Sequence, residues 1–144
     1  MTPVPVTDIM EQAIGVRPKE AWMGRDLVCV LDNEKQVYNA EPNQTIISQA
    51  DGLLFHITAP GTDYDCVTRT FAPKMGVPED AVCGSGHCHV IPLWSEKLRR
   101  QELCALQASR RTGVLYCRMD GERVMIAGKA CLYCSAELYI PQYP

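Results

Sequence analysis

The sequence lacks the features that would direct it to a membrane, to export or to nucleic acid. Its net charge is −3, and no run of like charges provides the basic surface that nucleic-acid binding requires. No apolar stretch approaches the roughly 18 residues that span a bilayer. The N-terminus has no basic region followed by the apolar core of a signal peptide. We therefore expect a cytoplasmic protein without a nucleic-acid or membrane partner.

A disulfide framework is also not expected, although the chain contains eight cysteines. At 144 residues the chain is long enough to bury a hydrophobic core as a single domain, so its fold does not depend on crosslinks. Cys29, Cys66 and Cys117 lie in apolar or alternating runs, where a free cysteine packs as a small hydrophobe. We expect reduced thiols.

The hydrophobic pattern predicts short helices near the N-terminus, one longer helix and several strands. Thr7 is placed to cap the first helix, whose apolar face begins at Ile9, and Pro42 is placed to start the second. Asp120-Gly121 predicts a type I′ hairpin turn. The order of elements, without regular βαβ alternation, favours an α+β fold in which a mostly antiparallel sheet wraps around one helix. The predicted helices cover residues 8–14, 42–50 and 85–99, and the predicted strands cover residues 27–31, 53–58, 64–71, 103–107, 114–119, 123–126 and 130–140.

The densest group of chemically active residues is the segment 79–89, Glu-Asp-Ala-Val-Cys-Gly-Ser-Gly-His-Cys-His. Its glycines and serine lie where the long helix is predicted to start, so their backbone N–H groups are available to an anion. Side chains capable of acid–base chemistry stand beside that site. The segment therefore indicates chemistry next to a bound carboxylate or phosphate, although a glycine-rich turn that only starts a helix would look the same.

The other cysteine and histidine patterns favour neither a metal nor a redox site. The Cys-x4-Cys spacing of Cys83 and Cys88 is not a usual zinc arrangement, and successive helical positions point in different directions. Cys131 and Cys134 form a C-x-x-C pair, but in a strand-like run one faces the core and the other the surface. His56 lies in an apolar strand and is interpreted as structural.

The segment 79–89 resembles the signature of the phenazine-biosynthesis PhzF-like family. The residues that carry the resemblance are Glu79-Asp80, Gly84-Ser85-Gly86-His87-Cys88 and Pro92-Leu93-Trp94. Further motifs follow in the family's order and extend the resemblance over nearly the whole chain. They are Gly24-Arg25-Asp26-Leu27-Val28, Thr58-Ala59-Pro60-Gly61, Asp65-Cys66-Val67-Thr68-Arg69, Phe71-Ala72-Pro73, and Ser109-Arg110-Arg111 with the Asp120-Gly121 hairpin.

The resemblance implies a diaminopimelate-epimerase-like fold of two similar lobes, each a β-barrel-like sheet around a central helix, with the active site between them. The chain is similar only to the second, C-terminal lobe, so residues 1–144 are interpreted as one lobe and the N-terminal lobe as absent. In the family, the first lobe carries the principal acid–base glutamate and a partnering histidine. We expect the opposite half of the site to come from a homodimer partner or a separately encoded first lobe.

The same resemblance assigns roles to the residues at the predicted helix start. Gly84, Ser85 and Gly86 would bind a small carboxylate-bearing substrate. Asp80 and Ser85 would line the catalytic site, with Asp80 orienting or relaying a proton and Ser85 hydrogen-bonding the substrate. Both residue types are also good helix caps, and the two roles are compatible. Glu79 is interpreted as an exposed loop carboxylate.

Cys83 allows two interpretations. Cys-Gly-Ser-Gly is similar to the Cys-Gly-Thr-Gly of cofactor-independent epimerases and proline racemases, in which a thiolate at a helix start removes a proton next to a carboxylate. The helix dipole would lower the thiol pKa and supply that thiolate. Alternatively, Cys83 is a small buried residue in the position where many PhzF-like proteins have threonine, and this is the favoured interpretation.

The sequence therefore predicts a PhzF-like isomerase or epimerase lobe that transfers a proton next to a substrate carboxylate. It would use no cofactor and no metal, and it would need a second lobe for full activity. One alternative is a binding module for small carboxylates, or a degenerate half-enzyme that has lost its catalytic partner. A zinc or redox cysteine protein is the more remote alternative.

Overall fold

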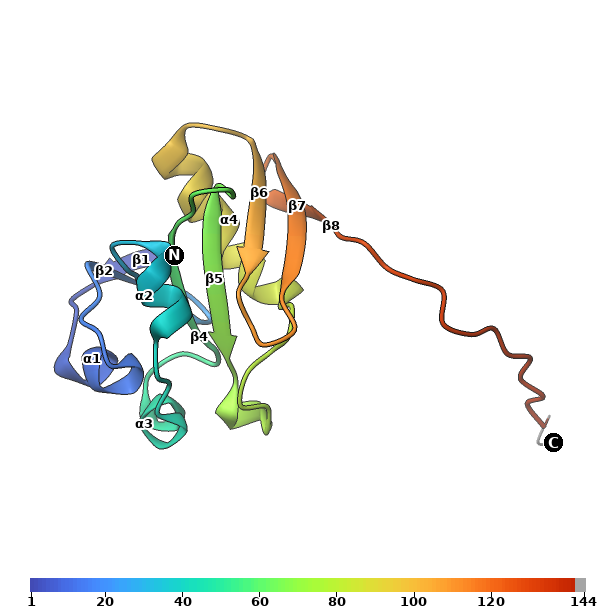
Figure 1. Ribbon diagram of the computed structural model, residues 1–144, viewed down its shortest axis with the longest axis horizontal. Helices are drawn as coiled ribbons and strands as arrows, with labels where there is room; N and C mark the ends of the chain where they lie inside the picture. The colour runs from blue at the N-terminus through green and yellow to red at the C-terminus, as the bar shows by residue number, and fades with distance from the viewer. Residues whose placement is uncertain (142–144) are drawn as a thin grey trace.

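The computed structural model describes residues 1–141, which fold into one mixed sheet with α-helices packed on it (Figure 1). The eight strands within these residues are β1 (Thr2–Val4), β2 (Glu20–Met23), β3 (Leu27–Val30), β4 (Phe55–Pro60), β5 (Cys66–Phe71), β6 (Glu102–Gln107), β7 (Gly113–Asp120) and β8 (Arg123–Ala127). The helices are α1 (Asp8–Ile14), α2 (Glu34–Asn39), α3 (Gln44–Gln49), the 3-10 turn η1 (Pro73–Met75) and α4 (Gly84–Leu98).

The strands lie in the sheet in the same order as in the chain, from β1 to β8. Neighbours are antiparallel except for the pairs β3–β4 and β5–β6, which are parallel. A parallel pair requires a crossover, and α2 with α3 supplies the first and α4 the second. Antiparallel pairs predominate as expected, but the sequence did not predict these two crossovers. The sheet remains open with β1 and β8 as its edges, so the expected barrel-like closure is not confirmed.

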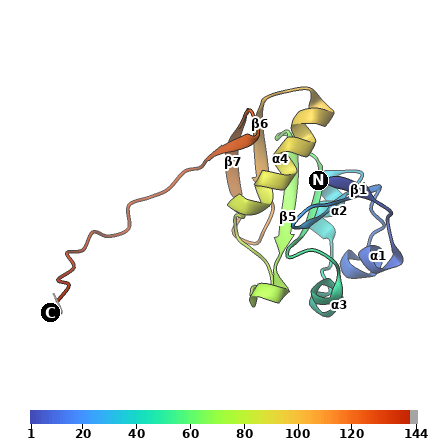
Figure 2. The same cartoon turned by 180° about the vertical axis from the view of Figure 1, so that it is seen from behind.

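The sheet is buried on both faces, as strand β3 illustrates. Leu27 and Cys29 pack in a core with α1, α2 and α3, whereas Val28 and Val30 pack in a second core with α4. A continuous apolar run is typical of a strand covered on both sides. Figure 2, seen from behind, shows α4 lying across the face opposite to the three short helices.

Helix α4 runs through Pro92 and supplies the centre of the second core. Val90, Ile91 and Trp94 are buried there against strands β3, β5, β6 and β7. The indole Nε1 of Trp94 donates a hydrogen bond of 2.9 Å to Thr58 Oγ1 on β4. This anchoring fixes the position of the helix start, where the chemically active segment lies.

Several local expectations need correction. Ile9 is exposed rather than part of the core. Asn43, not Pro42, precedes α3, and its side chain caps that helix. Residues 34–39, which gave an ambiguous pattern, form α2 because Asn33 caps them in the same way. In the hairpin, Asp120 pairs with Arg123, so the central residues are Gly121 and Glu122. Gly121 alone has a positive φ, +60°, as in a type II′ rather than a type I′ turn.

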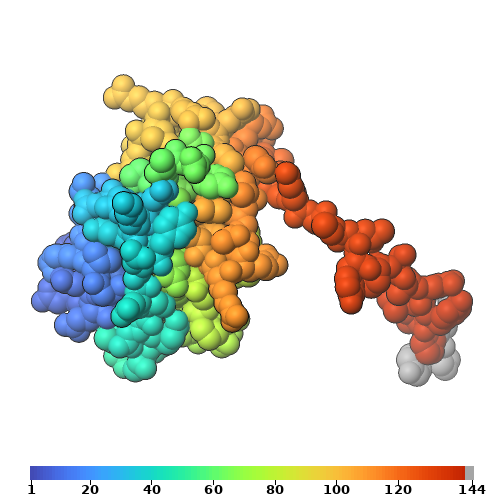
Figure 3. All heavy atoms as spheres, viewed as in Figure 1, coloured from blue at the N-terminus to red at the C-terminus, as the bar shows by residue number. Residues whose placement is uncertain are grey.

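The largest correction concerns the end of the chain, which we call the tail and define as residues 128–141. The strand predicted over residues 130–140 is wrong for the described chain: the tail contains no strand and extends away from the body (Figures 1 and 3). Cys131 and Cys134 are both exposed, so neither is a core cysteine. The alternating pattern is suited to a strand, but no neighbouring strand is present to pair with it.

All eight cysteines are free within the described structure. Cys29, Cys66 and Cys117 are buried as expected. Burial raises the pKa of the Cys29 thiol to about 12 and that of Cys117 to about 11, so these thiols act as apolar groups. Among residues 1–141, no helix combines the length and apolarity needed to cross a membrane.

Candidate active site at the start of helix α4

Helix α4 begins directly after Cys83, and its first turn leaves two backbone donors open. Cys83 is the N-cap residue, and its Sγ accepts a hydrogen bond of 3.3 Å from the N–H of Gly86. The N–H of His87 bonds the carbonyl oxygen of Cys83 at 3.3 Å. The N–H groups of Gly84 and Ser85 have no acceptor within the helix, and both residues are exposed. These donors and the positive end of the helix dipole favour an anion here.

A buried carboxylate, Asp26, lies beside this helix start and was missed in the sequence. Asp26 follows β2 and directly precedes β3, and its side chain is fully buried. Arg25 bonds it through two nitrogens, with Nε 2.9 Å from Oδ1 and Nη2 2.6 Å from Oδ2. The N–H of Leu54 donates to Oδ1 at 3.3 Å, and His56 Nε2 lies 3.1 Å from Oδ2. Burial alone would raise the pKa of Asp26, but the hydrogen bonds from His56 and Arg25 outweigh it and hold that pKa well below its usual range.

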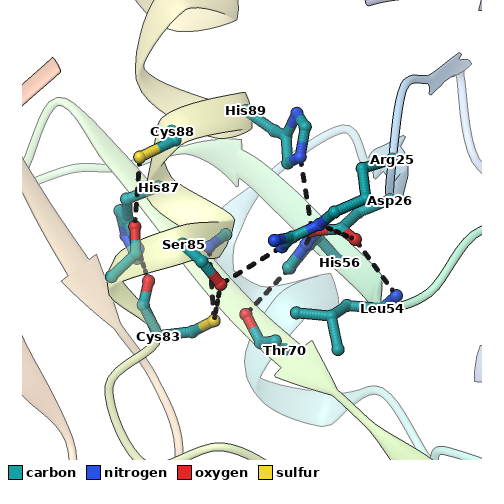
Figure 4. A network of polar contacts seen from close by, with 12 residues as sticks. Arg25, Asp26, Leu54, His56, Thr70, Cys83, Ser85, His87, Cys88 and His89 are labelled. Carbon is teal, nitrogen blue, oxygen red and sulfur yellow. Dashed lines mark hydrogen bonds and ion pairs between the residues drawn. The ribbon is translucent and has the colours of Figure 1, made fainter. Parts of the chain in front are cut away.

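Two histidines and a threonine complete this group, which we call the Asp26 cluster: Arg25, Asp26, His56, Thr70 and His89 (Figure 4). His56 is fully buried, and its Nδ1 lies 2.9 Å from Thr70 Oγ1. In the tautomer that donates from Nε2 to Asp26, Nδ1 accepts a hydrogen bond from the Thr70 hydroxyl. His89, from the second turn of α4, brings its Nε2 to 3.4 Å from Asp26 Oδ2. Desolvation lowers the pKa of His89, which is partly buried.

Arg25 connects the Asp26 cluster to the helix start. Its Nη2 donates to Ser85 Oγ at 3.2 Å while the same guanidinium is held in two places by Asp26. The Arg25 side chain is about half exposed, at 49%. The hydrogen bond to Asp26 raises the pKa of Arg25, so the cation is permanent. A fixed positive charge therefore lies next to the open N–H groups of Gly84 and Ser85.

Gly86 has a packing role that the sequence did not reveal. A Cβ atom at Gly86 would lie 2.5 Å from Cε1 of His56 and 3.2 Å from Sγ of Cys83. Both neighbours are buried, so neither can move aside cheaply. The N–H of Gly86 is also already bonded to Cys83. Gly84 and Ser85 are therefore the open donors, whereas Gly86 brings the helix start close to His56.

The thiol of Cys83 is buried, and its pKa is raised rather than lowered. Burial is the main cause, and the nearby carboxylate of Asp80 adds to it. The hydroxyl of Ser85, 3.6 Å from the sulfur, and the N–H of Gly86 act in the opposite direction without reversing the shift. The thiolate that the helix position suggested is therefore disfavoured in the chain as described.

Asp80 lies in the loop before α4 and is only partly buried. Its Oδ1 accepts a hydrogen bond of 3.0 Å from the N–H of Val82, and its carbonyl oxygen accepts one of 2.6 Å from Gln107 Nε2. The N–H of Cys83 bonds the other end of the same amide, Gln107 Oε1, at 2.6 Å. Gln107, at the end of β6, thus holds both Asp80 and Cys83 and brings these two predicted residues together.

Glu79 is not the exposed loop carboxylate that the sequence suggested. Its two oxygens accept from Arg69 Nε at 2.8 Å and Nη2 at 3.1 Å. Arg69, on β5, also donates to the carbonyl oxygen of Ala40 at 2.8 Å. The pair is mostly buried, with the two side chains 12% and 22% exposed. Glu79 therefore fixes the loop that leads into the site.

A hollow of about 590 Å³ opens on the other side of the helix start. Gly84 lines it together with Arg111 and Lys129, so two basic side chains stand at its border. The turn that carries Arg111 is anchored by Ser109, whose Oγ donates to the carbonyl oxygen of Ala81 at 2.6 Å. Lys129 belongs to the tail, which therefore leaves the body beside the candidate site.

His87 and Cys88, which follow the helix start, point in different directions because they occupy successive positions of α4. His87 is fully buried, and its Nδ1 lies 2.7 Å from the carbonyl oxygen of Cys83. Its Nε2 has no hydrogen-bond partner among residues 1–141, and burial lowers its pKa. Cys88 is exposed and lies apart from Cys83, with its Sγ 3.7 Å from the carbonyl oxygen of Gly84 (Figure 4). Within the described residues, no group of three or more histidine, cysteine or acidic side chains is arranged to hold a metal ion.

Known proteins similar to this chain share both its sequence and its fold. Residues 15–136 match the family described as phenazine biosynthesis-like protein. A protein of Pseudomonas aeruginosa named as an uncharacterized isomerase is 41% identical over 90% of this chain and 50% of its own length. The crystal structure of a PhzF-family phenazine biosynthesis protein from Enterococcus faecalis is 38% identical, with a TM-score of 0.90 over 96% of this chain and 54% of its own.

A second crystal structure agrees with the first. A putative PhzC/PhzF protein from Clostridium difficile is 35% identical, with a TM-score of 0.85 over 97% of this chain and 55% of its own. The chain spans about half the length of these relatives. The match over most of the chain, in both sequence and fold, shows that the chain belongs to the phenazine biosynthesis-like (PhzF) family.

Proposed function

We propose that this chain is one lobe of an isomerase and transfers a proton next to the carboxylate of a small substrate. The observation that carries this proposal is the fixed cation of Arg25, 3.2 Å from Ser85 Oγ and next to two open N–H groups at the start of α4. A carboxylate is the complementary ligand, because it accepts from a guanidinium and from backbone N–H groups at the same time. The family membership and a relative named as an isomerase support the same reaction type.

Different residues at the start of α4 bind the carboxylate and transfer the proton. Gly84 and Ser85 bind the carboxylate through their N–H groups, and the Ser85 hydroxyl adds a further donor. Asp80 holds or relays the proton, because it is the partly exposed acid at the site, whereas Asp26 is fully buried and already paired. The Cys83 thiol lies close enough to Asp80 for the carboxylate to raise its pKa, and the two residues are held by the same glutamine.

The site is completed by a second lobe, which we take to be of the same family. The chain spans half the length of its relatives, and we propose that it corresponds to their C-terminal lobe. The principal acid or base would come from the opposite lobe, either from a separate first-lobe chain or from a homodimer partner. Full activity therefore requires the pair.

A binding module for small carboxylates is the second candidate. A protonated Cys83 thiol does not remove a proton from carbon, so without a base from the opposite lobe the chain keeps only its carboxylate-binding groups. In that case the helix start would hold the carboxylate without turnover.

Two measurements separate these functions. In the chain alone, adding succinate as a small carboxylate should shift the amide resonances of Gly84 and Ser85, and Ser85→Ala should weaken that binding. Ser48→Ala is a matched control, because Ser48 bonds only the carbonyl oxygen of Thr45 on the surface of α3. Absence of any shift at these amides would exclude both functions at this place.

Turnover is tested in a chimera in which this chain replaces the matched segment of the Enterococcus faecalis protein. Amino acids and enol acids are incubated in D2O, and exchange of the proton next to the carboxylate is followed by NMR. We expect exchange in the chimera, strong loss in Asp80→Asn, and none in the chain alone. Carboxylate binding without exchange in the chimera would favour the binding module.

A further inference from the structure

His56 is a fully buried histidine on β4 to which the proposed function gives no role. Its register partner on β3, Val28, packs in the core with α4, so the imidazole lies on the face of the sheet that α4 covers. Its register partner on β5 is Thr70. The ring therefore lies between the sheet and the first turn of α4, close to the candidate site (Figure 4).

The start of α4 packs directly on the His56 ring. A Cβ atom added at Gly86 would lie 2.5 Å from His56 Cε1 and 3.0 Å from Nδ1. Only a residue without a side chain allows the helix backbone to approach the ring this closely. Gly86 directly follows Ser85, so the contact with the ring also fixes the positions of the open N–H groups of Gly84 and Ser85.

The other side of the same ring holds the carboxylate that anchors Arg25. His56 Nε2 lies 3.1 Å from Asp26 Oδ2, and Arg25 Nη2 lies 2.6 Å from the same oxygen. Asp26 is ionised, because its pKa is held well below its usual range, and His56 therefore presents an N–H to it rather than a lone pair. Arg25 has a long, half-exposed side chain, and the buried carboxylate restricts its rotamers.

Thr70 holds the ring from its second nitrogen. Its Oγ1 lies 2.9 Å from His56 Nδ1, and both side chains are fully buried. When Nε2–H is directed to Asp26, the Thr70 hydroxyl donates to the lone pair of Nδ1, so both ring nitrogens have a partner. The ring cannot turn about its Cβ–Cγ bond without breaking two buried hydrogen bonds. His56 is therefore a rigid support shared by the helix start and by Asp26.

We propose that His56 is the positioning residue of the carboxylate site: it sets the spacing between the guanidinium of Arg25 and the open N–H groups of Gly84 and Ser85. That spacing suits a ligand with two oxygens on one carbon, because one oxygen accepts from the helix start and the other from the guanidinium. The identity of the ligand rests on the proposed function, whereas the positioning of Arg25 does not. His56 itself does not touch the ligand and transfers no proton.

Two amide variants at position 56 separate the two hydrogen bonds of the ring. In His56→Gln the amide nitrogen can take the place of Nε2 and donate to Asp26, whereas the shorter side chain of His56→Asn reaches Thr70 but not Asp26. Succinate binding is followed at the amide resonances of Gly84 and Ser85. We expect its dissociation constant to rise by about tenfold or more in His56→Asn and by less than about threefold in His56→Gln.

The order of the Arg25 side chain is a second readout, and it needs no ligand. In the parent, the Nε–H of Arg25 donates to Asp26 Oδ1 at 2.9 Å, so its NMR signal should be sharp and its exchange with water slow. His56→Asn should accelerate this exchange by about tenfold or more, and His56→Gln by much less. A purely structural role of His56 would instead make the exchange follow the stability of each variant, which urea unfolding measures.

If neither amide variant folds, a milder pair on β5 tests the same assignment. Thr70 and Thr68 are both fully buried on one face of that strand, but Thr68 bonds Thr58 rather than His56. Thr70→Val should weaken succinate binding and accelerate the exchange at Arg25, each by about threefold or more, and Thr70→Ser should restore both. Thr68→Val should leave both within about twofold of the parent.

Equal effects of His56→Asn and His56→Gln on the exchange at Arg25 would overturn the proposal, as would equal effects of Thr70→Val and Thr68→Val where these are the folded pair. Succinate binding that is present in the parent and unchanged in His56→Asn would reject this inference alone. If the exchange at Arg25 responds as expected but the parent binds no succinate, the proposed function is rejected and the positioning of Arg25 by His56 stands.

Discussion

Asp26 and Asp80 both lie near the start of helix α4, but they differ in burial and in the number of hydrogen bonds that their carboxylates accept. Asp26 is fully buried, accepts hydrogen bonds from Arg25, the Leu54 backbone and His56, and has a pKa well below its usual range. Asp80 is partly exposed, and the bond to its carboxylate is a local one from the Val82 backbone. Asp26 therefore holds Arg25 and His56 in place, whereas Asp80 is the carboxylate that we propose for the chemistry. Variants of these residues and of their neighbours test this division.

The largest effect is expected from Asp26→Asn. The substitution removes a buried negative charge and leaves His56 and Arg25 without their partner. Because Arg25 is half exposed and can be rehydrated, we expect the lower end of the usual loss, about 3 kcal/mol in the free energy of unfolding. Asp80→Asn should cost less than about 1 kcal/mol, because an amide oxygen can accept the Val82 bond equally well. Urea unfolding of both variants measures the difference, and equal losses would contradict the division.

Two glycines at the helix start should respond very differently to the same added methyl group. Gly86→Ala places a Cβ 2.5 Å from His56 Cε1, so we expect a loss of about 1 to 3 kcal/mol. Gly84→Ala meets nothing within 4 Å and should change stability by less than about 1 kcal/mol. Thermal unfolding of the pair measures this, and a destabilised Gly84→Ala with a neutral Gly86→Ala would refute the packing role.

The pH dependence of stability should identify Asp26. Its pKa is lower in the folded chain than in the unfolded chain, so its contribution is fully present above the ordinary carboxyl pKa of 3.8 and is lost as the pH falls towards its folded value. Below about pH 4 the parent should lose stability faster than Asp26→Asn, with an excess slope of up to about 1.4 kcal/mol per pH unit. Urea unfolding at pH 7, 5, 4 and 3 tests this, and parallel curves over that range would contradict it.

The smallest effect concerns the thiol next to Asp80. In a variant with Cys88→Ser, Cys104→Ser, Cys131→Ser and Cys134→Ser, the midpoint of Cys83 alkylation should lie above the ordinary thiol pKa of 9.0, because burial and Asp80 both raise the pKa. Adding Asp80→Asn should move the alkylation profile to lower pH, because one of the two causes is removed while burial, the larger cause, remains. An alkylation midpoint near pH 7 would instead restore the thiolate interpretation of Cys83.

The sequence predicted the elements whose side chains repeat over short distances. The apolar run of β3, the helix face centred on Trp94 and the hairpin of β7 and β8 were all recognised from local patterns. The start of the long helix near Gly84 and Ser85 was also predicted, because a helix start has a local signature. The residues considered as caps were Asp80 and Ser85, whereas the cap is Cys83.

The remainder of the site depends on contacts between distant residues. Arg25 meets Ser85 across 60 positions and His56 meets Asp26 across 30, which no local pattern records. The available signal was a charged pair, Arg25-Asp26, immediately before a wholly apolar strand, where a carboxylate is forced into the core. Glu79 was misjudged for the same reason, since Arg69 lies on another element. The strand predicted over residues 130–140 was wrong for a different reason. The side-chain pattern is that of a strand, but a strand forms only where a neighbouring strand pairs with it.

The uncovered tail also bears on how long such a chain survives in solution. Residues 130–136 carry no charge at all, and Glu137 is the only ionised side chain between Lys129 and the end of the described chain. Charged residues that normally interrupt apolar strands and prevent them from stacking with one another are thus nearly missing. With this segment uncovered, the chain would be prone to self-association and accessible to proteases.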